Sequence, residues 1–247
     1  MEQPSLCFII ACKLYRQYPI YLEHYVSNIQ KFYPSALTIL VDNNSSYNEY
    51  YERFMDMKNV VCIENTSESK FELGAYKFAT EYIKQNTLNF DYYVCTQDTF
   101  ILVNKYDFNT LVANGTKACA LSHFHFNKSN NYHKHVLSQL NLYDPNEEFL
   151  CCWCSSWCCD HESLLSINTL LNSIVPVIRY HSEQTERYMG KILKLLNNNV
   201  SASIETEIEC NNYNCHSIDP TSEEAKQYGN YFIKHAQQKN ENTLNLI

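Results

Sequence analysis

The feature that most constrains the fold is an alternation of short apolar runs with helical segments over the first hundred residues. The apolar runs have the length of strands and contain almost no polar residues, as in strands buried on both faces. The segments between them repeat apolar residues three and four positions apart, which is the spacing of one helix face. This alternation predicts an α/β fold with a mostly parallel central sheet flanked by helices. The expected strands are 6–11, 37–41, 60–63 and 92–96, and the expected helices are 18–32, 47–57 and 71–85.

The second half of the chain is less regular. We expect strands at 118–121 and 149–159, and helices at 162–171, 184–196 and, near the C-terminus, 223–237. No internal repeat or linker is recognisable, and a chain of 247 residues fits one domain over residues 1–247.

Composition narrows the functional classes. Proteins that bind the phosphate backbone of nucleic acid usually carry a net positive charge. The formal net charge of this chain is −8 and its isoelectric point about 5.6, so we expect no nucleic acid partner. We find no apolar run of transmembrane length and no signal-peptide layout at the N-terminus, which predicts a soluble, cytoplasmic protein. The 12 cysteines are then expected to be mostly free, buried thiols rather than disulfides.

Two acidic residues follow expected strands directly. Asp42 comes after the second strand and Asp98 after the fourth. In open parallel sheets ligands bind at the carboxyl ends of the strands, so these carboxylates are candidate site residues. The chain has no GxGxxG after the first strand and no GxxxxGK[ST] anywhere, which disfavours ordinary dinucleotide and P-loop sites.

The ordered segments LCFIIA, LTILVDNNSS, FELGAYKFA and DYYVCTQDT resemble the nucleotide-binding half of a GT-A glycosyltransferase. Within that fold, they resemble family 2 and related viral or bacterial sugar transferases. The resemblance covers roughly residues 5–110 and extends more weakly to about 195. It implies a Rossmann-like GT-A fold, with about 1–110 binding a nucleotide-sugar and about 111–247 forming the acceptor half and C-terminal tail.

The implied activity is metal-assisted transfer of a hexosyl or deoxyhexosyl group. The donor would be a nucleotide-diphosphate sugar. UDP is the expected nucleotide because it is frequent among donors of this family. The acceptor would be a hydroxyl group of a glycan or another molecule. Direct displacement would invert the anomeric carbon, although no sequence feature excludes retention.

The resemblance also implies nucleotide contacts. In the family, the acid after the second strand contacts the nucleobase or ribose, and Asp42 matches it; a turn and helix-capping role is equally open. The helix start at 71–79 would lie beside the donor, or it is an amphipathic core helix. The implied nucleotide-binding residues are Ala11, Asp42, Glu72, Gly74, Lys77 and Gln97.

The family's metal-binding DxD motif corresponds to Gln97-Asp98-Thr99, which retains one of the two usual carboxylates. Mn²⁺ or Mg²⁺ could be held by one carboxylate together with phosphate oxygens and water. A late histidine, His216, would complete the ligand set. The alternative is that Asp98 is an ordinary residue of the turn after the strand.

An inverting transferase needs a carboxylate that takes the proton of the acceptor hydroxyl. The segment 181–187 matches the family's helix start by position, which indicates Glu186 as the base, Glu183 as the alternate and Asp160 as a third candidate. The same residues could instead favour the dipole of the helix that follows.

The run from Cys151 to Cys159 alternates as a strand would, with Trp153 and Trp157 on one face. We expect this run to be a structural strand, and we expect its two tryptophans to contact the acceptor. Zinc is the alternative, with Cys210, Cys215 and His216 as the second set of ligands. Two other classes also stay open for the whole chain, a nucleotidyltransferase and a non-catalytic binding module on a degenerate GT-A fold.

Overall fold

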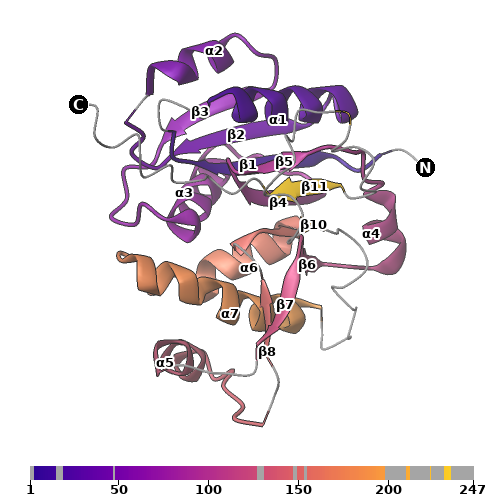
Figure 1. Cartoon of the computed structure of the whole chain (residues 1–247). Helices are drawn as coiled ribbons and strands as arrows, with labels where there is room; N and C mark the ends of the chain where they lie inside the picture. The colour runs from indigo at the N-terminus through magenta and orange to yellow at the C-terminus, as the bar shows by residue number, and fades with distance from the viewer. Residues whose placement is uncertain are drawn as a thin grey trace.

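The computed structural model shows a central sheet with helices on both faces (Figure 1). None of the described helices is both long and apolar enough to cross a membrane. The structure describes residues 3–14, 19–46, 48–126, 131–146, 149–152, 155–197, 210–211, 223 and 231–234.

The main sheet has six strands in the order β3-β2-β1-β4-β9-β6. The first four strands run parallel to one another, and β9 is antiparallel to both β4 and β6. The predicted α/β class with a mostly parallel sheet is therefore confirmed. The strands are β1 (Leu6–Cys12), β2 (Leu37–Asp42), β3 (Val60–Glu64), β4 (Tyr92–Gln97), β6 (Ala118–Ala120) and β9 (Trp157–Cys159).

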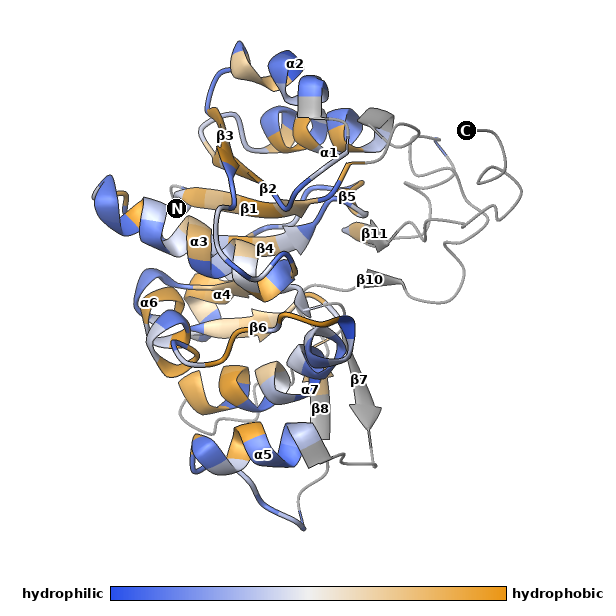
Figure 2. Cartoon of the chain, turned by 90° about the vertical axis from the view of Figure 1, so that its left-hand side faces the viewer, coloured by the Kyte–Doolittle hydropathy of each residue, from blue (hydrophilic) through white to orange (hydrophobic). Residues whose placement is uncertain are grey.

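Helices cover both faces of this sheet because both faces of β1 are apolar (Figure 1). Figure 2 shows the apolar residues gathered on the central strands and on the helix surfaces turned toward them. The helical segments are α1 (Pro19–Phe32), η1 (Asn48–Tyr51), α2 (Glu52–Met55), α3 (Glu72–Gln85), α4 (Asn109–Asn114), α5 (Asn131–Gln139), α6 (His161–Leu170) and α7 (Arg179–Leu196).

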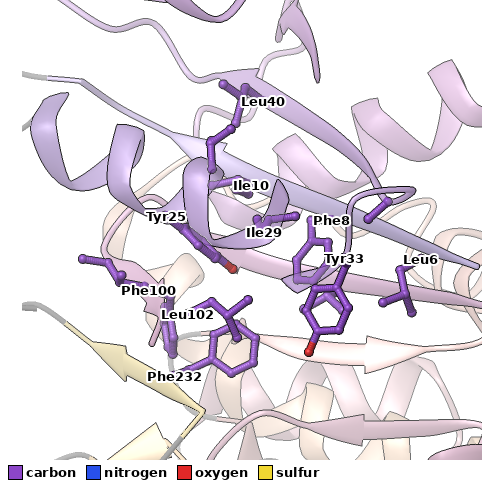
Figure 3. Packing of buried hydrophobic residues seen from close by; sticks show 14 of the residues in the cluster. Leu6, Phe8, Ile10, Tyr25, Ile29, Tyr33, Leu40, Phe100, Leu102 and Phe232 are labelled. Carbon is purple, nitrogen blue, oxygen red and sulfur yellow. The ribbon is translucent and has the colours of Figure 1, made fainter. Parts of the chain in front are cut away.

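One core lies between the sheet and α1. Side chains from alternate positions of β1, including Phe8 and Ile10, pack there against Tyr25 and Ile29 of α1 (Figure 3). The Phe232 ring, which comes from the far C-terminal part of the chain, is fully buried in the same core and meets Tyr25 edge-on with ring centroids 6.4 Å apart. Burial of such rings fixes the C-terminal strand against the first half of the chain.

The other core lies on the opposite face of the sheet. It takes the remaining β1 positions together with apolar residues of α3, α5, α6 and α7. Two successive residues of β1 thus belong to two different cores, which is why the strand reads as a continuous apolar run.

Two smaller sheets flank the main one. The strand β5 (Phe100–Leu102) pairs antiparallel with β11 (Phe232–Lys234), which pairs in turn with β10 (Cys210–Asn211). The strand β7 (His123–Phe126) pairs antiparallel with β8 (Phe149–Cys152). The predicted helix over 223–237 is wrong at its centre, because 232–234 form β11 along β5.

The expected single strand over 149–159 is also wrong. It is divided into β8, which pairs with β7, and β9, which belongs to the main sheet. Ser155, between them, has φ 49°, a left-handed conformation that interrupts an extended chain. Alternation of residue types could not show this break, since the alternation that places Trp153 and Trp157 on one face runs straight across Ser155.

A buried amide fixes the loop between β3 and α3. Asn65 is fully buried, and its Nδ2 donates to Oδ1 of Asn43 at 2.7 Å and to the carbonyl of Ser69 at 2.8 Å. Its Oδ1 accepts the backbone N–H of Ser67 at 2.9 Å and the Ser67 hydroxyl at 2.6 Å. The Ser69 hydroxyl donates to the carbonyl of Pro176 at 2.5 Å, so the same loop is also attached to the connection between α6 and α7.

We expect Asn65→Ala to lower the free energy of unfolding by about 2 to 3 kcal/mol, because buried donors and acceptors lose their partners. Urea denaturation monitored by circular dichroism measures this change. The control is Asn168→Ala, which removes a surface hydrogen bond to Glu81 and should change stability by less than about 1 kcal/mol. Equal effects of the two substitutions would contradict the assigned role of Asn65.

Candidate functional site

The candidate site lies where the strand order reverses. From β1 the chain proceeds to β2 and β3 on one side, and then returns to place β4 on the other side of β1. The chain therefore leaves the carboxyl end of β1 toward one side of the sheet, while β4 lies on the other side. In open α/β sheets, this is the position at which ligands bind.

Asp98 joins the ends of these two strands. Its backbone N–H donates to the carbonyl of Ala11 at 3.0 Å, and its Oδ2 accepts the backbone N–H of Lys13 at 2.8 Å. The Asp98 side chain is only partly buried. The predicted site residues Ala11 and Asp98 are thus brought together at the switch point.

Asp42 lies beside Cys12, its register partner on β1. Its Oδ1 accepts the backbone N–H of Ser45 at 2.9 Å and the Tyr51 hydroxyl at 3.2 Å, and it also accepts the Ser45 hydroxyl. Asn44 adopts φ 66° within this turn, a conformation that asparagine tolerates. Asp42 therefore shapes the turn after β2, as one of its two sequence interpretations expected.

The carboxylates of Asp42 and Asp98 both raise the pKa of two buried groups, the Cys12 thiol and the Tyr51 hydroxyl. Burial raises the pKa of the Cys12 thiol, and the negative charges of Asp98 and Asp42 raise it further. Burial also raises the pKa of the Tyr51 hydroxyl, with smaller contributions in the same direction that include Asp42 and Asp98. The two acids thus flank the end of β1 from its two sides, since β2 and β4 are its neighbours in the sheet.

Glu72 and Gln97 meet at the same edge. Glu72 Oε1 accepts Nε2 of Gln97 at 2.9 Å, and Glu72 Oε2 accepts the hydroxyl of Ser182 at 2.8 Å. Gln97 Oε1 accepts the hydroxyl of Thr99 at 3.2 Å. This network links the start of α3, the end of β4 and the start of α7.

Gly74 and Lys77, two other expected nucleotide contacts, have packing roles. A Cβ on Gly74 would lie 2.4 Å from the Ser69 carbonyl oxygen, so the glycine permits the loop to approach α3. Lys77 Nζ donates to the carbonyls of Leu171 and Asn172 at 2.8 and 3.0 Å, just beyond the end of α6. Burial lowers the pKa of Lys77. A nucleotide contact from either residue stays a prediction.

The two expected bases differ in surroundings. Glu183 accepts Nε of Arg179 at 2.9 Å, and its side chain is 56% exposed. Glu186 is partly buried. Burial raises the pKa of the Cys151 thiol to about 12. The charge of Arg187 opposes this increase, and the charge of Glu186 adds to it. Glu186 therefore lies within electrostatic range of Cys151 in β8. Asp160 instead caps α6, accepting the N–H of Ser163 at 2.7 Å.

The expected acceptor contact from Trp157 is not available in this structure. The indole is 0% exposed and packs edge-on against Tyr76, with ring centroids 4.8 Å apart. Its position in β9 turns it into the core under α3 rather than toward solvent. Trp153 and His216 lie outside the described residues.

The residues present fit a hard cation only in part. Within the described part of the chain, no group of three His, Cys, Asp or Glu side chains could hold a metal ion. The described cysteines of β8 and β9 belong to no such group either. Cys154, Cys215 and the side chain of Cys210 lie outside the described residues. Mg²⁺ is often held by one or two carboxylates together with substrate phosphates, and Asp98 suits that mode.

Sequence reasoning missed Ser182, Tyr51 and the backbone N–H of Lys13. The sequence predicts a helix that begins at residue 184, but α7 begins at Arg179, so Ser182 lies within the helix and its hydroxyl donates to Glu72. The contact joins residues 110 positions apart. No local pattern could indicate it.

We expect Gly74→Ala to lower the free energy of unfolding by about 1 to 3 kcal/mol, because the added methyl group would overlap Ser69. Thermal and urea denaturation measure the change. Without that contact, alanine would stabilise α3 by roughly 1 kcal/mol. A stabilised variant would therefore show that the close approach is absent.

No protein-family model matches the sequence, and no curated protein matches it either. Among solved structures, the chain is similar to a mannosyltransferase from Pyrobaculum calidifontis in complex with GDP-Man and Mn²⁺, with a TM-score of 0.42 and 12% identity over 67% of this chain. It spans only 47% of that protein.

Two fungal structures give similar values. Core-mannan synthase A from Aspergillus fumigatus, in an Mn/GDP form, has a TM-score of 0.40 and 8% identity, over 78% of this chain and 68% of that one. A mannosyltransferase from S. cerevisiae in complex with GDP has a TM-score of 0.39 and 10% identity, over 78% and 63%. Likenesses at this level assign neither a family nor an activity.

Proposed function

We propose that the chain is a glycosyltransferase with a GT-A arrangement, which moves a sugar from a nucleotide-diphosphate donor to a hydroxyl acceptor. The observation that carries the proposal is the convergence of Asp42 and Asp98 at the carboxyl ends of β2 and β4, on the two sides of β1. The resemblance of the segments that contain these acids to nucleotide-sugar enzymes supports it.

In this proposal Asp42 contacts the ribose or base, and Asp98 faces the diphosphate. Part of the Asp42 carboxylate shapes its own turn, so its position is fixed before a ligand arrives. Asp98 is held in the same way by the N–H of Lys13. Bound Mn²⁺ or Mg²⁺ would supply positive charge to the departing diphosphate.

Glu186 is the proposed base. Two of its features support the choice over Glu183: it is partly buried, and it lies about 40° around the helix from Ser182, which points to the site edge through Glu72. Base catalysis would contribute about 10²- to 10⁴-fold to the rate. The proposed course is a single displacement with inversion, from a UDP-sugar to a glycan hydroxyl.

We expect the protein to release the nucleoside diphosphate slowly from one member of a panel of UDP- and GDP-sugars in the presence of Mn²⁺. Asp98→Asn should lower this rate by about 10²- to 10³-fold, because the variant loses the carboxylate that would hold the divalent cation against the departing diphosphate. The matched control is Asp56→Asn, an exposed carboxylate after α2, which should leave the rate unchanged. Coupled detection of released UDP or GDP measures both.

Other outcomes would identify the remaining classes. Release of pyrophosphate from a nucleoside triphosphate would indicate a nucleotidyltransferase. Binding of a nucleotide-sugar without turnover would indicate a binding module. An Asp98→Asn variant with the wild-type rate would contradict the assignment of Asp98.

A further inference from the structure

Glu72 is the first residue of α3, and both of its carboxylate oxygens are engaged by other elements. One accepts the side-chain amide of Gln97 at 2.9 Å, and the other accepts the hydroxyl of Ser182 at 2.8 Å. Ser182 is 8% exposed, so this second hydrogen bond is largely shielded from water. Shielding strengthens a hydrogen bond to a charged group.

Each partner of Glu72 leads to one part of the proposed site. Gln97 ends β4 and accepts the Thr99 hydroxyl, so it spans the turn that carries Asp98. Ser182 lies near the start of α7, and Glu186 is one turn further on nearly the same face. A chain of hydrogen bonds therefore runs from the Asp98 turn to the helix that carries Glu186.

The start of α7 has no side-chain cap of its own. Its N-cap, Ile178, makes no side-chain hydrogen bond, and the first turn contains no acidic residue. The hydrogen bond from Ser182 to Glu72 therefore ties the start of α7 to the start of α3.

We infer that Glu72 is a positioning residue, which holds α7 and hence Glu186 at a set distance from the Asp98 turn. The catalytic part of this inference rests on the proposed function. It differs from the expectation that Glu72 contacts the nucleotide, since its two oxygens bind protein groups. The role requires hydrogen bonds but not the chemistry of a free carboxylate at the reacting atoms.

Substitution by glutamine or alanine separates these roles. In Glu72→Gln, the amide oxygen can still accept from Gln97 and the amide nitrogen can donate to the Ser182 hydroxyl, so both links are retained. Glu72→Ala loses both links, and Ser182→Ala loses one. Glu81→Ala is the matched control, because Glu81 lies on the same helix and binds Lys84 and Asn168 on the surface.

We expect Glu72→Ala to lower kcat by about 10- to 100-fold with a donor KM within about threefold of wild type, because misplacement of a reacting group acts on the rate. Glu72→Gln should recover kcat to within about threefold of wild type. Ser182→Ala should lower kcat, and the double variant Glu72→Ala/Ser182→Ala should be no slower than Glu72→Ala alone, since the two residues share one link. Glu81→Ala should match wild type.

Amide hydrogen exchange tests the link without any turnover. The first two turns of α7 should exchange faster in Glu72→Ala and Ser182→Ala than in wild type, and at the wild-type rate in Glu72→Gln and Glu81→Ala. If wild type turns over no donor, the proposed function fails while exchange still tests the link. Unchanged exchange in Glu72→Ala, or a Glu72→Gln variant as slow as Glu72→Ala, would overturn the inference.

Discussion

The hydrogen bonds of Asp98 to the end of β1 are the constraint on which the candidate site depends. The backbone N–H binds the Ala11 carbonyl and the carboxylate binds the N–H of Lys13, so the chain leaving β1 and the turn leaving β4 are held together where the strand order reverses. A carboxylate fixed by backbone groups loses little freedom when a ligand arrives. The same constraint places Asp98 across β1 from Asp42.

The second half of the chain reaches this edge through polar contacts as well as through packing. Apolar faces of α6 and α7 cover the sheet. Apolar packing alone does not fix the position of α7 along the surface of the sheet. The Glu72–Ser182 hydrogen bond and the Ser69–Pro176 hydrogen bond fix that position at two points. A directional contact determines register more sharply than a non-directional apolar surface can.

Several residues with the right chemistry for a ligand are used by the fold instead. Lys77 binds carbonyls beyond the end of α6, Gly74 allows the Ser69 loop to approach, and the Trp157 indole fills a core. The local segment around each residue predicts a nucleotide or acceptor contact. A local segment gives the residue type but does not give the direction of the side chain relative to other elements.

The sequence by itself determined the alternation of strands and helices, the burial of both sheet faces and the position of two acids at the carboxyl ends of β2 and β4, because periodicity and strand ends are local properties. Only the tertiary structure decided that β4 lies next to β1, that 149–159 divides between two sheets and that Ser182 faces Glu72. These facts depend on contacts between distant segments. Such contacts follow from the packing of whole elements, which no window of sequence contains.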